Sequence, residues 1–245
     1  MSRFFVSPQK VRDNKILIDG EEAHHILDVM RMQDGDNVTV FDGTGNEYSG
    51  FIENSDRAAG RLTVRIVRTD KPSARRMPRV TLAQAIPKKS KMDYIVEKAT
   101  ELGVNRIIPL VTKRTIVRPD DRRRAKKVDR WKKLAVEAAK QCGRTDVPEI
   151  EQITQFSDMV SRMDQYDLVL FASLRDDTIP LRQSLEGFKN GDILVFIGPE
   201  GDFTPEEAEM ACAGNCRFVS LGDRVLKSDT AGLALLSVLD YEFSE

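Results

Sequence analysis

The residues best placed to do chemistry lie in two short loops of the carboxyl-terminal third. Residues 197–203 read Ile-Gly-Pro-Glu-Gly-Asp-Phe and directly follow an apolar run, residues 193–196. Glycine lets a backbone approach a ligand closely, and open α/β sheets bind ligands at the carboxyl ends of their strands. The first loop is therefore a candidate ligand site that contains the carboxylate of Glu200. A plain turn before a helix at Thr204 is the alternative.

The second loop spans residues 221–231 and joins the last predicted strand to the last predicted helix. It mixes Arg224, Lys227 and Asp229 with small and apolar residues. Ser228 or Asp229 has the right type and place to cap the helix. A cap does not account for the two basic side chains, so ligand binding remains the second interpretation.

Several familiar kinds of site are missing from the sequence. No G-x-G-x-x-G follows a strand and no G-x-x-x-x-G-K-[ST] occurs, which argues against Rossmann dinucleotide binding and a P-loop. The histidines, His24 and His25, are adjacent, and the cysteines Cys142, Cys212 and Cys216 are odd in number without a nearby histidine. We therefore expect no metal centre and no Ser-His-Asp triad.

Basic residues are concentrated in the middle of the chain, although the net charge is −1. Residues 71–92 contain seven basic residues and no acid, and residues 113–133 contain eleven basic and three acidic residues. Such clustering is typical of a phosphate-binding surface, and a solvated helix face is an equally good explanation. The candidate RNA contacts are Lys88, Lys89, Lys91, Arg114, Arg118, Arg122, Arg123 and Arg124.

The pattern of apolar residues and turns divides the chain in two. Residues 1–70 predict a small β-barrel with one helix, because several short strands alternate with tight turns. A linker without periodicity follows at residues 70–78. The expected strands are 15–18, 37–41, 47–54 and 62–68, and the expected helix is 21–30.

The rest of the chain alternates strands with helices, which predicts an α/β domain with a mainly parallel sheet covered by helices on its faces. The expected strands are 80–85, 106–111, 167–172, 192–198 and 217–221. The expected helices are 92–102, 125–141, one that begins after a cap at Thr204, and 229–241. The apolar runs are too short to span a bilayer and no signal peptide is evident, so we expect a cytoplasmic protein without a membrane partner.

In order and spacing, several segments resemble the ribosomal RNA small subunit methyltransferase E family of the SPOUT (trefoil-knot) superfamily. The resemblance covers nearly the whole chain. It rests on His25 with Val29-Met30-Arg31-Met32, the Gly35-Asp36 turn, Pro87 to Asp93, Glu97 to Val104, Arg130-Trp131, Glu137-Ala138-Ala139, Gln141-Cys142-Gly143-Arg144 and the two loops.

The resemblance implies a fold and a reaction. Residues 1–70 would form a PUA-like β-barrel that docks RNA, and residues 75–245 a SPOUT methyltransferase domain with a carboxyl-terminal deep trefoil knot. The protein would be a homodimer that uses S-adenosylmethionine (SAM) to methylate N3 of a uridine in small-subunit (16S) ribosomal RNA, within an assembled subunit. The implied cofactor-binding residues are Phe171, Ala172, Ser173, Ile197, Gly198, Pro199, Glu200, Gly201, Leu221, Gly222, Val225, Leu226, Ser228, Thr230 and Ala231.

Three catalytic candidates follow. Arg144 would contact a phosphate or the uracil oxygen that gains charge, unless it binds carbonyls at a helix end. Glu200 or Asp229 would accept the N3 proton, unless these carboxylates only satisfy backbone N–H groups.

The sequence departs from the family pattern at three positions. Asp202 stands where the family usually has glycine, and Lys227 and Asp229 stand where it usually has arginine and glutamate. Two alternatives therefore stay open. One is a related SPOUT enzyme that acts on transfer RNA or another ribosomal site, and the other is an RNA-binding protein that has lost catalysis.

Overall fold

The computed structural model describes residues 3–71, 78–88, 91–116, 121–214 and 216–244. They form two compact units, one made of Met1–Arg75 and Val136–Val147, the other of Arg76–Ala135 and Pro148–Glu245. The first unit thus includes a segment that lies beyond the boundary expected from the sequence. Within the described ranges, no helix has the length and hydropathy needed to cross a membrane. Nor do three His, Cys, Asp or Glu side chains gather there as a metal-binding group.

The first unit is built on a six-stranded sheet that is antiparallel except at one edge, where β1 runs parallel to β4. Register shifts between β5 and β6 bend these two long strands. Alternate residues of the strands face a core that includes Phe4, Ile16, Val40 and Leu62. In sheet order the strands are β1 (Arg3–Phe5), β4 (Asn37–Phe41), β5 (Glu47–Asp56), β6 (Arg61–Asp70), β3 (Lys15–Asp19) and β2 (Val11–Arg12).

One helical segment packs on this sheet. It begins as α1 (Gly20–His24) and continues as a π-helical turn, His25–Val29, so the predicted helix is confirmed with a wider last turn. Ala23, Ile26 and Leu27 are buried on its inner side. A short 3₁₀ turn, Pro8–Lys10, precedes β2.

The segment Val136–Val147 of the first unit includes the end of α3 (Asp121–Cys142). Lys140 Nζ lies 2.7 Å from Glu22 Oε1, and the N–H of Val147 donates to the carbonyl of Gly43 at 3.0 Å. The N–H of Gly45 donates to the carbonyl of Thr145 at 3.1 Å. These contacts join the segment to α1 and to the turn between β4 and β5.

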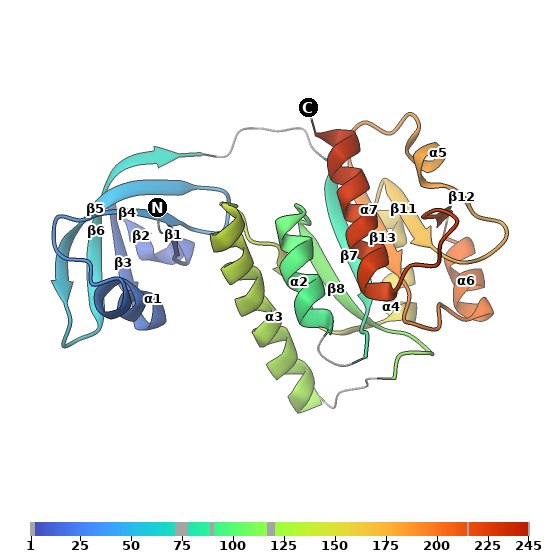
Figure 1. Cartoon of the computed structure of the whole chain (residues 1–245), viewed down its shortest axis with the longest axis horizontal. Coiled ribbons are helices and arrows are strands. Elements are labelled where there is room, and N and C mark those ends of the chain that lie inside the picture. Colours follow the sequence, from blue (N-terminus) through green and yellow to red (C-terminus); the bar gives the residue numbers. More distant parts are fainter. Residues whose placement is uncertain (1–2, 72–77, 89–90, 117–120, 215, 245) are drawn as a thin grey trace. The chain divides into compact units, whose positions relative to one another are not determined.

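The second unit contains a parallel sheet, whose strands β7, β8, β11, β12 and β13 are labelled in Figure 1. The strand order is β10-β8-β7-β13-β11-β14-β12, with β9 also paired to β8. Its central strands are buried almost throughout, as expected where helices cover both faces. The strands are β7 (Arg79–Ala85), β8 (Arg106–Val111), β9 (Glu149–Ile150), β10 (Thr154–Gln155), β11 (Leu168–Ala172), β12 (Ile179–Pro180), β13 (Asp192–Ile197) and β14 (Arg217–Ser220).

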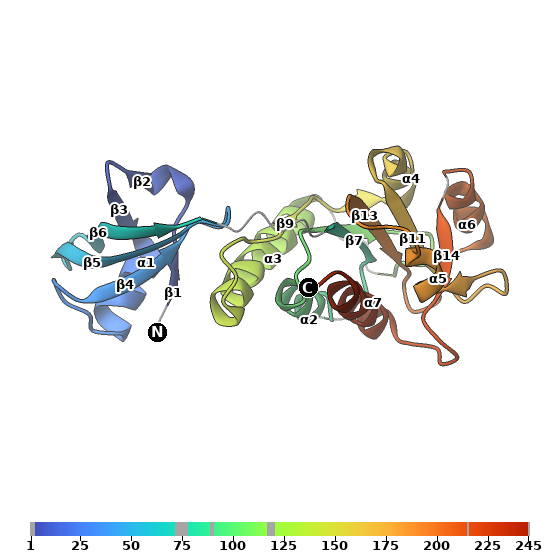
Figure 2. The ribbon, with the colours of Figure 1, turned by 90° about the horizontal axis from the view of Figure 1, so that it is seen from above.

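Helices lie on both faces of this sheet (Figure 2). α2 (Lys91–Glu101) and α7 (Ser228–Phe243) pack side by side on one face. α4 (Phe156–Val160) and α6 (Pro205–Cys212) pack together on the other, and α5 (Leu181–Leu185) contacts β12 and β14. The core under α4 and α6 contains a cluster of phenylalanines, Phe156, Phe171, Phe196, Phe203 and Phe218. A 3₁₀ turn, Met163–Gln165, precedes β11.

The predicted cap of α6 is present. The N–H of Glu207 donates to Thr204 Oγ1 at 3.3 Å, and Glu207 Oε2 accepts from the N–H of Thr204 at 2.9 Å. Pro205 opens the helix because its missing N–H has no partner to lose there. The cap fixes where the chain turns after the loop that ends at Phe203.

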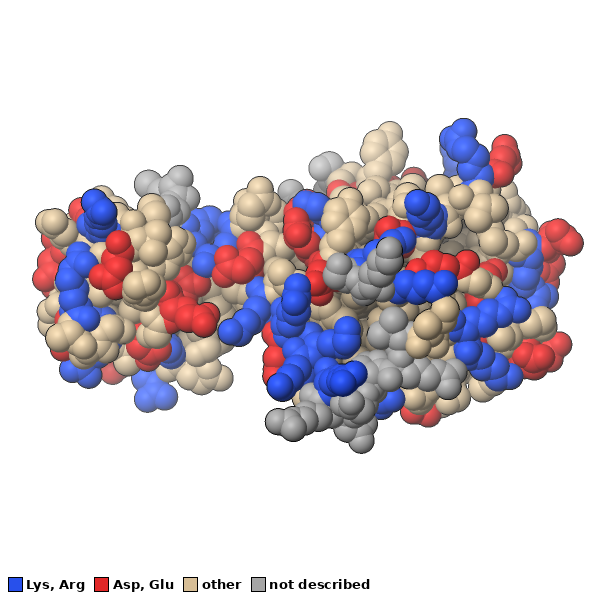
Figure 3. All heavy atoms as spheres, turned by 60° about the horizontal axis from the view of Figure 1, so that its bottom comes forward, with Lys and Arg blue, Asp and Glu red and all other residues tan. Residues whose placement is uncertain are grey.

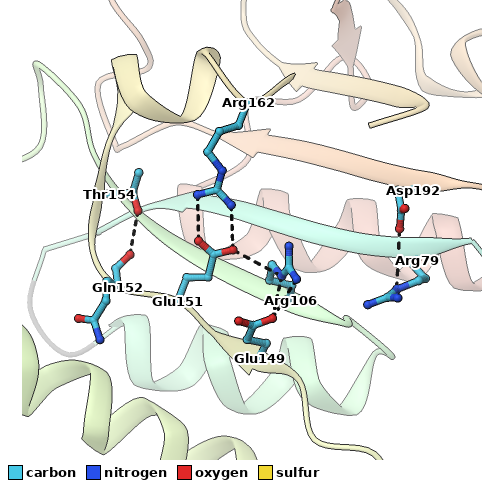
Figure 4. A network of polar contacts seen from close by, with 8 residues as sticks. All are labelled: Arg79, Arg106, Glu149, Glu151, Gln152, Thr154, Arg162 and Asp192. Atoms are coloured by element: carbon cyan, nitrogen blue, oxygen red, sulfur yellow. Dashed lines mark hydrogen bonds and ion pairs between the residues drawn. The ribbon is translucent and has the colours of Figure 1, made fainter. Parts of the chain in front are cut away.

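An ionic network joins elements at the amino ends of the strands (Figure 4). Glu151 accepts hydrogen bonds from both terminal nitrogens of Arg162 at 3.0 Å, and Arg106, the first residue of β8, lies 2.9 Å from Glu149 and 3.5 Å from Glu151. Arg79 and Asp192, the first residues of β7 and β13, form a looser pair at 3.8 Å. These ion pairs lie at the edge of the sheet opposite to the one from which the loops after β11, β13 and β14 leave.

Candidate active site

The carboxyl ends of β11, β13 and β14 meet at one edge of the parallel sheet. Ala172 pairs in register with Ile197 on one side and with Val219 on the other. The loops that leave these three strands therefore start side by side, although they are 20 or more residues apart along the chain. The two loops selected from the sequence and the loop after Ala172 converge here.

The three loops enclose a cavity of about 230 Å³. Twelve of the fifteen predicted cofactor residues line it, whereas Phe171, Gly201 and Thr230 do not. The residues predicted from the sequence that line it are Ala172, Ser173, Ile197, Gly198, Pro199, Glu200, Leu221, Gly222, Val225, Leu226, Ser228 and Ala231. The lining residues that were not predicted as cofactor ligands are Leu174, Asp202, Ser220, Arg224 and Lys227.

Side chains of α7 and β7 hold the loop after β13 in place. Ser228, at the start of α7, donates to the carbonyl of Gly198 at 2.5 Å, and Gln84 of β7 donates to Ser228 Oγ at 3.0 Å. Both side chains are buried. A Cβ at Gly198 would lie 3.0 Å from Asp202 Oδ1 and 3.1 Å from the ring of Phe203, so any side chain at this position would have to displace these neighbours by a few tenths of an ångström.

Two further contacts hold the same loop from its sides. Glu200 Oε1 accepts from the N–H of Lys88, which follows β7, at 3.0 Å. Arg114, which follows β8, donates to the carbonyls of Gly201 and Phe203. Elements β7, β8 and α7 thus all fix the shape of one cavity wall.

Asp202 closes the wall between two loops. Its φ of 59° lies in the left-handed region, where glycine is at ease and aspartate is one of the tolerated side chains. Its carboxylate accepts from the N–H groups of Phe203 at 2.8 Å and Leu174 at 3.2 Å, and from Ser173 Oγ at 3.4 Å. The side chain therefore ties the loop after β13 to the loop after β11.

Comparison with known proteins finds matches over nearly the whole chain. Residues 75–240 match the model of the RNA methyltransferase domain, and residues 18–63 match that of the RNA methyltransferase PUA domain. The ribosomal RNA small subunit methyltransferase E of Bacillus subtilis is 30% identical over 99% of this chain and 97% of its own length. The enzyme of the same name from Rickettsia conorii is 29% identical over 96% and 93%.

A solved structure agrees with these matches. The ribosomal RNA small subunit methyltransferase E of Neisseria gonorrhoeae, bound to S-adenosyl methionine, superimposes with a TM-score of 0.85 at 27% identity over 99% of this chain and 98% of that one. This chain belongs to the ribosomal RNA small subunit methyltransferase E family. It is an RNA methyltransferase by family, as the resemblance in its sequence predicted.

The three catalytic residues predicted for this family member occupy different places. Glu200 lines the cavity and is exposed. Asp229 lies one residue past the cavity-lining Ser228, where its Oδ1 is 3.2 Å from Lys91 Nζ. Arg144 belongs to the first unit, where its guanidinium binds both carboxylate oxygens of Asp146 at 3.3 and 2.6 Å.

The predicted RNA contacts of this family member also differ in their surroundings. Lys88 is exposed beside Glu200, but Lys91 pairs with Asp229 and Arg114 binds loop carbonyls. Arg123 and Arg124 lie on α3, whereas Lys89, Arg118 and the side chain of Arg122 fall outside the described residues.

A basic stripe on α3 was only partly selected from the sequence. Arg123, Lys126, Lys127 and Arg130 are spaced i, i+3, i+4 and i+7, so they share one face of the helix. They line a hollow of about 480 Å³ together with Ile86, Met92, Asp93 and Trp131. Figure 3 shows basic side chains gathered over this part of the surface. The helical spacing was the signal in the sequence that would have found the stripe.

Side-chain contacts join the base of the stripe to α2. Asp93 accepts from Trp131 Nε1 at 3.0 Å through one oxygen and pairs with Arg130 at 2.7 Å through the other. Trp131 is buried, and Lys127 Nζ lies 5.8 Å from the centre of its ring. The helix face that carries the basic side chains is therefore bonded to α2 through Asp93.

Proposed function

We propose that this chain binds SAM in the cavity between the three loops and methylates N3 of a uridine in small-subunit (16S) ribosomal RNA. One observation carries the proposal. The loops after β11, β13 and β14 converge on a single cavity at the carboxyl edge of the sheet. The family relative from Neisseria gonorrhoeae, which has the same fold, is bound to S-adenosyl methionine.

The lining residues fit such a cofactor. Ile197, Leu221, Val225 and Leu226 offer apolar surface for a purine ring, and the backbone around Gly198 is open to close approach. Carboxylates and hydroxyls on the loops after β11 and β13 suit the amino and hydroxyl groups of a nucleoside. When bound, the cofactor supplies a methyl group that its sulfonium makes electrophilic.

The remaining work of the protein is positioning and proton removal. An oriented reactant lowers the barrier by roughly 7–11 kcal/mol in favourable systems. The uridine must be unpaired for its N3 to be reached.

Glu200 is the better proposed acceptor of the N3 proton, because it lines the cavity and is exposed, whereas Asp229 is held by Lys91. Arg144 is proposed to exchange Asp146 for an RNA phosphate or the uracil oxygen.

RNA docking is proposed for two surfaces. The basic stripe on α3 offers four cations on one helix face, which suits the sugar–phosphate backbone. The first unit, which matches the PUA domain model, supplies a second RNA-binding surface.

We also propose a homodimer and a trefoil knot. Tyr94 of α2 and Val238 and Tyr241 of α7 are large, exposed apolar or aromatic side chains on two adjacent helices, as an interface between copies requires. The knot is supported by the path of the chain. α7 follows β14, yet it crosses β11 and packs on β13, β7 and α2.

The test is methyl transfer from labelled SAM to small ribosomal subunits from cells that lack this protein. Mass spectrometry of the product should find one uridine labelled on N3. SAM binding without label on these subunits would move the substrate to transfer RNA or another ribosomal site. A chain that binds RNA but not SAM would be a non-catalytic RNA-binding protein, and the proposal would fail.

A further inference from the structure

Asp202 places a negative charge in the wall of the proposed cofactor cavity. The carboxylate stands on a left-handed backbone, with φ of 59°. Hydrogen bonds from Phe203, Leu174 and Ser173 hold the carboxylate in place. All of these donors are neutral N–H or O–H groups, so the structure assigns the carboxylate no cationic partner among the contacts that hold it.

Burial distinguishes Asp202 from the other charges around the cavity. Four described ionisable residues line it, and Glu200, Arg224 and Lys227 are exposed whereas Asp202 is half-buried. Exposed charges are screened by water and salt, and partly buried charges much less so. The field that a bound ligand experiences is therefore set disproportionately by Asp202.

The reaction changes the charge of the ligand in this cavity. The bond between sulfur and methyl breaks, a bond between methyl and N3 forms, and the N3 proton leaves to a base. The bonding electrons return to sulfur, so the cationic sulfonium becomes the neutral thioether of S-adenosylhomocysteine. The cavity has a volume of about 230 Å³ and Asp202 lines it. A sulfonium bound in it would experience the charge of Asp202 with little screening, because the screening length at physiological salt is roughly 8 Å.

We propose that Asp202 makes this cavity selective for the cationic cofactor over its neutral product, and so favours product release. The inference rests on the proposed function, because it assumes that SAM binds here. A residue that only ties two loops together would help both ligands equally. A negative charge helps the sulfonium alone.

The experiment measures the dissociation constants of SAM and S-adenosylhomocysteine by calorimetry for the full chain and three variants. Asp202→Asn and Asp202→Gly remove the charge, and the glycine variant leaves the left-handed backbone without strain. Asp223→Asn is the matched control, because this exposed carboxylate lies in the neighbouring loop and does not line the cavity. Thermal unfolding checks that each variant is folded.

In both Asp202 variants, the dissociation constant of S-adenosylhomocysteine divided by that of SAM should fall about threefold to tenfold, as expected for one partly screened charge. Asp223→Asn should leave the ratio unchanged. If both ligands weaken equally in the Asp202 variants, or neither does, the selectivity proposal is wrong and Asp202 is only a tether. If the wild-type chain binds neither ligand, the proposed function itself fails.

Discussion

At the scale of single residues, the two candidate proton acceptors differ in what holds them. Glu200 is exposed at the cavity and its carboxylate accepts a hydrogen bond from the backbone N–H of Lys88, whereas Asp229 pairs with Lys91 Nζ. We expect Glu200→Gln to lower the methyl-transfer rate about 10²- to 10⁴-fold, the usual contribution of a general base. The amide can still accept the Lys88 hydrogen bond, so SAM affinity should change little.

Asp229→Asn should act differently. The loss of its ion pair should weaken the start of α7 and alter SAM affinity more than the dependence of rate on pH. Single-turnover rates across pH check both variants. If Glu200→Gln keeps the wild-type pH–rate profile, Glu200 is not the base.

The charge pattern shows why single residues were hard to assign from the sequence. Lys91 and Arg114 both read as RNA contacts, because each lies in a basic stretch. Their partners, Asp229 and the carbonyls of Gly201 and Phe203, are 87 or more residues away along the chain. Only folding brings such pairs together, so charge alone does not separate a cation that is open to RNA from one that is bonded within the protein.

At the scale of secondary-structure elements, the turn between β4 and β5 depends on one buried carboxylate. Asp42 accepts from the N–H and Oγ1 of Thr44, from Asn46 Nδ2 and from the hydroxyl of Tyr48, at 2.7–2.9 Å. Burial acts to raise the pKa of Asp42, but these hydrogen bonds together outweigh it and the net pKa is lowered. Burial and the Asp42 charge also raise the pKa of Tyr48 to about 12.

The lowered pKa of Asp42 predicts how stability depends on pH. The group stabilises the fold fully above its unfolded pKa of about 4 and loses this contribution as the pH falls through its lower folded pKa. Asp42→Asn should cost about 1–3 kcal/mol at pH 7 and less in acid. Urea unfolding from pH 3 to 7 measures this. The control is Asp36→Asn, which alters an exposed carboxylate that accepts from the N–H of Gln33 and should cost under about 0.5 kcal/mol of unfolding free energy. If Asp42→Asn lost the same unfolding free energy at every pH, the prediction would be contradicted.

The ionic network at the amino ends of the strands should affect stability without affecting ligand binding. Glu151→Gln removes the charge that Arg162 and Arg106 share, and we expect a loss of about 1–2 kcal/mol in the free energy of unfolding. Because the cavity lies at the opposite edge of the sheet, SAM affinity should stay at the wild-type value. Arg79→Ala, which breaks the exposed pair at 3.8 Å, is the control and should change stability by less than about 0.5 kcal/mol. A changed SAM affinity in Glu151→Gln would show that the two edges are coupled.

Periodicity predicted the long elements well and the short ones poorly. The bounds of β4 and β8 agree with the expected ones, and the other expected strands and helices are present within a few residues. β9, β10 and β12 have two residues each, too few to show alternation, and were not expected. The alternation of strands and helices indicated a parallel sheet, but sheet order depends on contacts between distant strands. For that reason the convergence of the cavity loops was implied by family resemblance rather than by pattern.

At the scale of the whole molecule, the chain carries a net charge of −1, although the proposed substrate, ribosomal RNA, is itself negatively charged. The basic stripe on α3 concentrates positive charge on one face, so local rather than net charge should govern RNA affinity. The double variant Lys126→Gln and Lys127→Gln keeps most of each side chain but removes two of the four cations. It should weaken binding to small-subunit ribosomal RNA and lower the slope of log affinity against log salt by about 1.4–1.8. Lys132→Gln with Lys189→Gln removes the same charge from exposed positions outside the hollow, and it should leave that slope near the wild-type value. Equal slopes for the two double variants would mean that the stripe is a solvated helix face and that RNA is held elsewhere.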